Sequence, residues 1–177
     1  TLSGSANYSI RQDNYEALSK LTQALSLTSS AELYRGISVG LNISGAMSSE
    51  DSGKDQQIVS SNMGINLVPN NLVSINIGAS DVESWVSGDP VNSNNGKHVT
   101  RSFDTSITYN PLPAIYLFTA YGIVVETDQE TQTTQSIGGA WSPFRNGDLQ
   151  LNTSYREGLQ PDGTKDKTFA SSVHLSI

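Results

Sequence analysis

The sequence has no cysteine, few aromatic side chains and no long hydrophobic run. Without cysteine the chain forms neither disulfides nor thiolate metal sites, and this absence leaves the cellular compartment open. The longest strongly apolar stretch, residues 112–125, is interrupted by Pro113, Thr119 and Gly122 and falls short of the ~18 apolar residues of a membrane-spanning helix. The sequence therefore excludes a helical membrane protein.

Positive charge is also scarce, because 10 Lys and Arg residues stand against 17 Asp and Glu residues and the net charge is -7. Nucleic-acid surfaces carry the opposite balance, so the charge argues against nucleic acid as a partner. Hydrophobic residues make up only 36% of the chain. A β-barrel presents only alternate residues to lipid, so this content is compatible with a membrane-spanning sheet. The 177 residues fit a single domain, residues 1–177.

Alternation with a period of two residues runs through the whole chain. In one early segment Ile37, Val39, Leu41 and Ile43 share one parity, whereas the other parity is Ser, Gly and Asn, and the pattern recurs up to the last hairpin, residues 148–177. Successive side chains of a strand point to opposite faces, so each segment has an apolar and a polar face. The polar parity is almost uncharged, which suits the lumen of a barrel better than the solvated surface of a soluble sandwich.

Ten strands are predicted, separated by two alternating kinds of connection. Short connections are predicted at residues 32–36, 69–71, 110–113 and 142–147. Long polar connections, which hold most of the acidic residues, are predicted at residues 11–20, 48–57, 81–101, 128–132 and 157–167. One segment, residues 17–27, also fits an amphipathic helix because its leucines are three and four residues apart. We predict a strand there.

The alternation, the unequal connections and the aromatic residues near both strand ends resemble bacterial outer-membrane β-barrel proteins as a class. The resemblance implies an all-β, antiparallel up-and-down transmembrane barrel of about ten strands, with short periplasmic turns and long acidic extracellular loops. It also implies the bacterial outer membrane as location and the lipid bilayer as partner. The chain starts at Thr1 without Met and ends at Ile177 without the aromatic residue usual in this class. We expect a processed or truncated start, and either a variant ending or an arc of a larger barrel.

The polar parity predicts a lumen lined by small polar side chains and a few charges. The predicted lumen-lining residues are Ser38, Asn42, Ser60, Asn62, Asn66, Ser74, Asn76, Asp104, Ser106, Asn152, Ser154, Arg156, Ser172 and His174. Ten tilted strands give a barrel ~20 Å across, in which such short side chains leave space. A further expected partner is another protein chain inside or beside the barrel. Tyr116, Phe118 and Val124 share the inward parity and are the predicted contacts of a polypeptide that occupies the inner face. The predicted membrane-interface girdle is Tyr34, Phe103, Tyr109, Trp141, Phe144, Tyr155 and Phe169.

Charged and titratable residues form no recognisable catalytic or metal pattern. Asp104, Arg156 and Arg101 are candidates either for an ionic constriction or for a structural ion pair. His98 and His174 lack sequence neighbours that would complete a triad or a metal site. Residues 89–96 offer Asp and Asn oxygens but lack the spacing and the closing Glu of a calcium loop.

The sequence therefore predicts a non-enzymatic outer-membrane barrel with no metal and no cofactor, acting as a small passive pore or as a sleeve around a partner segment. One alternative is a soluble extracellular β-sandwich that binds glycans or proteins. The other is a hydrolase at the outer rim, in the manner of outer-membrane proteases, for which Asp81, Glu83, Asp89 and His98 are available.

Overall fold

The structure is a computed structural model that describes residues 1–15, 18–88, 96–144 and 149–175. These residues form one sheet of ten strands: β1 (Leu2–Tyr15), β2 (Leu18–Tyr34), β3 (Ile37–Glu50), β4 (Asp55–Asn70), β5 (Val73–Ser87), β6 (Gly96–Leu112), β7 (Ile115–Glu126), β8 (Gln132–Trp141), β9 (Leu149–Leu159) and β10 (Lys165–Leu175). No helix in this part of the chain is long and apolar enough to cross a membrane.

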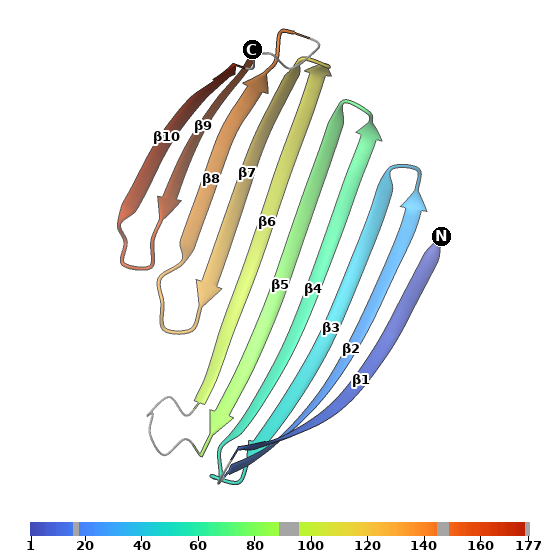
Figure 1. Cartoon of the computed structure of the whole chain (residues 1–177), viewed down its shortest axis with the longest axis vertical. Coiled ribbons are helices and arrows are strands. Elements are labelled where there is room, and N and C mark those ends of the chain that lie inside the picture. Colours follow the sequence, from blue (N-terminus) through green and yellow to red (C-terminus); the bar gives the residue numbers. More distant parts are fainter. Residues whose placement is uncertain (16–17, 89–95, 145–148, 176–177) are drawn as a thin grey trace.

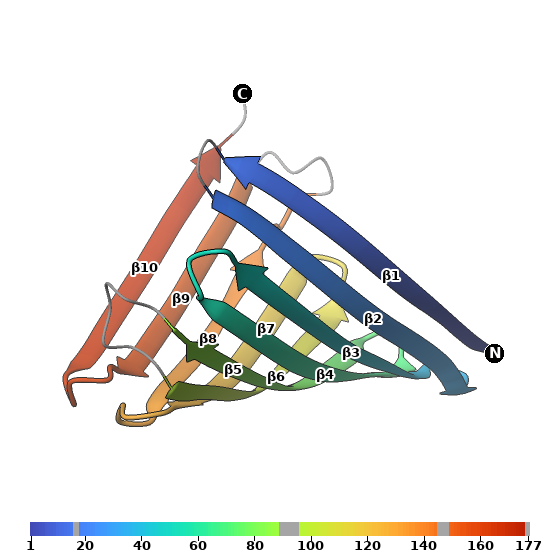
Figure 2. The same ribbon diagram turned by 90° about the horizontal axis from the view of Figure 1, so that it is seen from below.

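Each strand pairs antiparallel with its neighbours in sequence, so the sheet order is β1 to β10 (Figure 1). The sheet curls into an open trough whose two edges are β1 and β10 (Figure 2). Within the described residues no ladder joins these two edges. The prediction of ten up-and-down strands is confirmed. The described sheet is not closed into a ring. These residues form one sheet and not the two packed sheets of a β-sandwich.

The sheet has no buried core, because no side chain among the described residues is fully buried. Apolar side chains instead cover one exposed face: Leu41 is 42% exposed and Ile43 is 43% exposed. Asn42 and Ser44, which point the other way, are less exposed. Side chains spread apart on the convex side of a curved sheet and crowd together on the concave side, so the apolar parity lies on the convex face and the polar parity on the concave face.

The strands are longer than the sequence pattern predicts. The connections observed at the end where long loops are predicted are residues 51–54, 127–131 and 160–164. The predictions of long loops at residues 48–57 and 157–167 are therefore wrong, whereas the connection predicted at residues 128–132 is displaced by one residue. Residues 89–95 of the longest predicted loop lie outside the described residues. The acidic residues of the predicted loops largely belong to strands, because a polar side chain in water does not prevent an antiparallel ladder from continuing.

The first hairpin is corrected in the same way. Residues 11–15 belong to β1 and residues 18–20 to β2, and they pair with one another. Residues 16 and 17 lie outside the described part. β2 is a strand over its whole length, so the strand prediction is confirmed against the amphipathic helix.

The connections at residues 51–54 and 160–164 share a compact turn that explains how so few residues reverse the chain. The amide of Gly53 donates to the carbonyl of Glu50 at 2.9 Å, and the amide of Gly163 donates to the carbonyl of Gln160 at 3.0 Å. Both glycines have a positive φ, 86° and 77°, which other residues adopt only with strain. This arrangement is a tight turn followed by a glycine in the left-handed region, one of the commonest hairpin closures.

Candidate functional site: the polar face of the sheet

The strand register aligns the predicted polar residues into rows across the concave face. Ser38, Asn66, Asn76 and Ser106 occupy successive positions in one row from β3 to β6. All of the predicted lumen-lining residues have this parity, from Ser38 on β3 to His174 on β10. The sequence pattern therefore identified residues that share one face of a single sheet.

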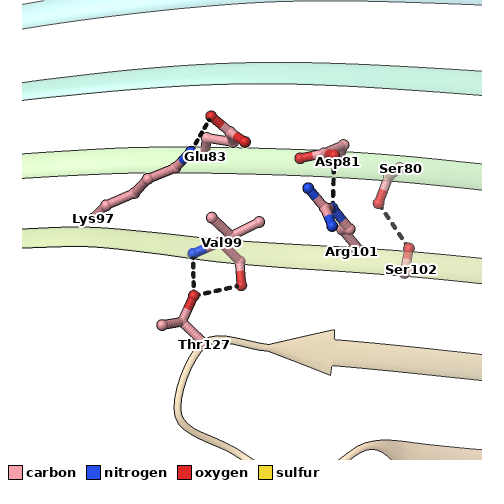
Figure 3. Close-up of polar contacts among 8 residues, drawn as sticks. All are labelled: Ser80, Asp81, Glu83, Lys97, Val99, Arg101, Ser102 and Thr127. Atoms are coloured by element: carbon pink, nitrogen blue, oxygen red, sulfur yellow. Dashed lines mark hydrogen bonds and ion pairs between the residues drawn. The ribbon is translucent and has the colours of Figure 1, made fainter.

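Hydrogen bonds between neighbouring strands link these polar side chains. The Asn66 side-chain amide donates to the Asn76 carbonyl oxygen at 2.5 Å, and the Asn76 amide in turn donates to Ser106 Oγ at 3.5 Å. The hydroxyls of Ser80 and Ser102 are 2.7 Å apart (Figure 3). Such cross-strand pairs stabilise the sheet and leave the remaining hydrogen-bonding positions of each group for water. The face is thus polar without being highly charged.

A row of glycines crosses the same face and surrounds one carboxylate. Gly40, Gly64, Gly78, Asp104 and Gly122 lie opposite one another in this order from β3 to β7. A Cβ atom on Gly78 would lie 2.5 Å from Asp104 Oδ1, so the carboxylate lies directly over the glycine backbone. A hollow of about 440 Å³ opens beside it. A larger residue than glycine at position 78 would push the carboxylate away from the sheet.

The candidates for an ionic constriction do not come together. Asp104 is on β6 and Arg156 on β9, in neighbouring rows but three strands apart, and no ion pair among the described residues joins them. Arg101 is on the opposite, convex face, where its Nε lies 3.0 Å from Asp81 Oδ2. Arg101 therefore does not contribute to an ionic constriction on the concave face, because it follows the parity of Phe103 and not that of Asp104.

Two aromatic residues of the concave face form a pair. The ring centroids of Tyr116 and Phe118 on β7 are 6.0 Å apart, with the rings inclined at 32°. The Phe118 ring lies across β8, because a Cβ atom on Gly138 would be 2.7 Å from Phe118 Cε1. Val124 shares this face but lies in the row of Ser102, nearer the other end of β7. The predicted three-residue contact stripe therefore consists of a pair and a separate valine.

β5 and β6 change character along their length. We call residues 73–79 of β5 with residues 103–109 of β6 the band segment, and residues 81–87 with residues 96–101 the extension. On the convex face the band segment carries Val, Ile, Ala, Phe, Thr and Tyr, whereas the extension carries Asp, Glu, Trp, Ser, Lys, Val and Arg. The concave face becomes more apolar in the extension, which has two valines among its inward residues.

Ion pairs occupy the convex face of the extension (Figure 3). Arg101 pairs with Asp81, and Lys97 Nζ lies 2.9 Å from Glu83 Oε2. Lys97 also lies 5.2 Å from the ring centroid of Trp85. The Arg101 side chain is 64% exposed, so these are pairs in water and each stabilises the fold little. They mark the point at which the convex surface stops being apolar.

The histidines are held in strands on the concave face. His98 is in β6, not in the predicted loop, and its Nε2 lies 3.4 Å from Thr100 Oγ1. His174 lies opposite Gln150 at the C-terminal edge. In the part of the chain that the structure describes, no three His, Asp or Glu side chains are grouped to hold a metal ion. Asp81 is on the convex face, so it is on the opposite side of the sheet from His98, and Asp89 lies outside the described residues.

Sequence reasoning missed two features of this face. The glycine row lies on the inward parity and could have been found by aligning the strands, but the alignment depends on the register of every hairpin. The inward residues of the extension, among them Val82, Ser84 and Val86, were hidden because the apolar parity changes face after Ser80. A pattern search that assumes one constant apolar face ends the strand at that point.

The arrangement of these residues is that of the outer-membrane β-barrel proteins: antiparallel neighbours in sequence order, an apolar convex face and a polar concave face. The predicted resemblance to this class is confirmed by the fold of solved structures. No family model matches the chain, and no curated protein matches its sequence.

Two solved structures carry the comparison. The outer membrane channel DcaP of Acinetobacter baumannii superposes with a TM-score of 0.66 at 13% identity, over 96% of this chain and 60% of that one. The NanC porin superposes with a TM-score of 0.51 at 7% identity, over 99% of this chain and 98% of that one. The chain thus spans about 60% of the length of DcaP. The predicted outer-membrane location agrees with these neighbours, and their likeness to this chain is one of fold.

Proposed function

We propose that the chain forms the wall of a passive, non-enzymatic channel for small polar solutes in the bacterial outer membrane. The observation that carries the proposal is the division of one coreless sheet into an exposed apolar face and a concave face of linked Ser and Asn side chains. In water such an apolar surface would be a liability for aggregation, whereas lipid covers it without cost.

The apolar face matches a bilayer in its length and in the aromatic residues that it carries. On β6 the apolar convex positions run from Phe103 to Leu112, comparable to the ~9–11 residues of a tilted membrane strand. Six of the predicted girdle residues, all except Phe144, are on this face, and Phe144 is in the connection after β8. We assign these aromatic residues to the two membrane interfaces, since their rings favour the boundary between hydrocarbon and water. The extension then projects into water.

A channel also requires that the edge strands β1 and β10 be paired. Each unsatisfied backbone group in hydrocarbon costs several kcal/mol, so a membrane sheet has no free edge. β1 and β10 therefore pair with each other or with further strands that complete a wider wall. The two cases give lumens of different width and conductances of different size.

Recording from planar lipid bilayers tests the proposal. Folded chain at low concentration is expected to give discrete, voltage-independent conductance steps, and liposomes that contain it are expected to swell in small neutral solutes. A silent bilayer with heat-modifiable, correctly inserted protein would reject the channel and favour a sleeve around another polypeptide. Chain that is monodisperse without detergent would reject the membrane placement altogether.

A further inference from the structure

The concave face of β7 to β10 contains a hollow that differs from the rest of the polar surface. It has a volume of about 450 Å³ and extends from Tyr116 and Phe118 across β8 to the polar residues Gln150, Asn152 and Ser172. None of the residues that line it is charged. Its size is that of a site for one small molecule.

The two sides of the hollow offer different chemistry. The aromatic side presents the tilted ring pair, and Tyr116 is 41% exposed. The polar side presents a chain of side-chain amides and a hydroxyl: Gln150 Nε2 donates to Asn152 Oδ1 at 3.3 Å, and Asn152 Nδ2 donates to Ser172 Oγ at 3.4 Å. These bonds leave the Gln150 carbonyl oxygen and the Ser172 hydroxyl proton available to a ligand.

The small residues of β8 make the hollow possible. Ala140 lies between Tyr116 and Asn152 in one row, and Gly138 lies between Phe118 and Ser154 in the next. Because neither has a long side chain, the aromatic rings and the amides face the same space over β8. The Phe118 ring also covers Gly138, so a structural role in shielding that glycine is the rival explanation for Phe118.

We propose that this hollow is a binding site for one ring of a neutral saccharide. A sugar ring has apolar C–H faces that stack on aromatic rings and hydroxyls at its rim that exchange hydrogen bonds with amides and hydroxyls. A purely apolar ligand would leave the polar side unpaired, which costs about as much as the lost hydrogen bonds. An ionic ligand would find no countercharge in the lining. The assignment rests on the proposed function, since it takes the concave face as the face that solutes reach.

The test measures binding apart from transport. Folded chain in detergent micelles is titrated with maltose, with phenol as an apolar ring and with glucuronate as a charged sugar, and saturable binding is followed by calorimetry or by saturation-transfer NMR. Maltose is expected to bind with a millimolar dissociation constant, more tightly than phenol or glucuronate. Preference for phenol, or no saturable maltose binding by folded protein, overturns the proposal.

Substitutions separate stacking from a structural role. Tyr116→Ala and Phe118→Leu are expected to weaken maltose binding about tenfold, because Leu keeps the bulk over Gly138 but has no flat ring. Tyr116→Phe is expected to keep the affinity within twofold. Val124→Ala, on the same strand and face but outside the hollow, is the matched control and is expected to bind as the parent does. Unchanged affinity in both Tyr116→Ala and Phe118→Leu contradicts the site.

Liposome swelling distinguishes the failure of this site from the failure of the proposed function. If liposomes with parent protein swell in glycerol while maltose binding is absent, the channel stands and the saccharide site falls. If maltose binds but no solute enters, the site stands and the channel falls.

Discussion

The band segment and the extension belong to the same two strands and share one uninterrupted ladder, yet their side chains follow opposite rules. In the band segment Ile77 and Ile107 are on the convex face and Asn76 and Ser106 on the concave face. In the extension the convex face carries ion pairs such as that of Glu83 with Lys97. The backbone is the same, so the difference reflects what the convex face touches. Lipid selects apolar side chains in the first case, and water permits charged ones in the second.

Strand formation and membrane contact are therefore separate properties of this sequence. Hairpin pairing continues as long as backbone groups find partners, whatever the side chains. Alternation with apolar residues on the convex face identifies only the part of each strand that lipid covers. If this separation is correct, substitutions in the two segments of β5 and β6 have effects of different size.

The largest effect is expected from a charge placed in the convex face of the band segment. Ile107→Arg puts a guanidinium between Phe103 and Tyr109, where it must leave water for hydrocarbon. A cost of about 2–4 kcal/mol is expected if this position is near the bilayer midplane. Folding into lipid vesicles, followed by heat-dependent gel mobility and urea titration, measures the loss.

Two arginine substitutions are matched controls for Ile107→Arg. Ser106→Arg, the neighbouring residue on the concave face, is expected to fold within about 1 kcal/mol of the parent and to reduce conductance. Val99→Arg is on the convex face of the extension, opposite Glu83, and is also expected to fold normally. A large loss of stability in Val99→Arg would mean that lipid covers the extension, and the proposed boundary would be wrong.

The next effect concerns the polar face of the band segment. Asp104 is the carboxylate of the glycine row, next to a hollow and without an ion pair among the described residues. Asp104→Asn keeps the shape and removes the charge, so a drop of about twofold in the ratio of cation to anion permeability is expected. Reversal potentials in a salt gradient measure it. Asp81→Asn, whose charge is on the convex face, is the control and is expected to change the ratio less.

The sequence predicted the fold well where lipid imposes a simple rule. The ten strands, their order and the polar parity from Ser38 to His174 all follow from the period of two, because a one-residue slip would turn every apolar side chain away from the bilayer. It failed in the extension, where Asp81 and Arg101 were placed in a loop although they are paired strand residues. Polar strands in water look like loops in composition.

Other parts of the site depend on register, which a single sequence specifies poorly. The four glycines in the row of Asp104 are on four different strands, and their alignment requires that every intervening hairpin have the right length. The pairing of Phe118 with Gly138 likewise depends on the turn between β7 and β8. Tyr116 and Phe118 were identified because they break the polar parity, but their common ring surface is a property of the folded sheet.

A smaller effect is expected from the ion pair that begins the extension. Asp81 and Arg101 pair with their side chains 40% and 64% exposed, so solvent screens most of their attraction. A double-mutant cycle with Asp81→Asn and Arg101→Gln is expected to give a coupling below about 1 kcal/mol, and 0.5 M salt is expected to reduce it. A coupling of several kcal/mol would contradict the placement of the extension in water, because it would mean that the pair lies in a medium of low dielectric constant.

The smallest effect is local and concerns the turn between β9 and β10, which is at the same end of the sheet as the extension and which we therefore place in water as well. The backbone amide and the hydroxyl of Thr164 both donate to Asp162 Oδ1, at 2.9 and 2.6 Å, and these bonds lower the pKa of the Asp162 carboxyl below its ordinary value of 3.8. Because the pKa is lower in the folded turn than in the unfolded chain, the carboxylate stabilises the turn above pH 3.8, and this stabilisation is lost as the pH falls through the lowered value. The amide proton shift of Thr164 in micelles is therefore expected to titrate below pH 3.8, together with that of Gly163, while the strand amides of β9 stay unchanged. Asp162→Asn keeps an acceptor oxygen but cannot titrate, so it is expected to abolish the pH dependence. Titration of Thr164 above pH 3.8 in the parent would mean that the carboxylate lies in a dry environment, and the turn would then not belong to the part of the sheet that projects into water.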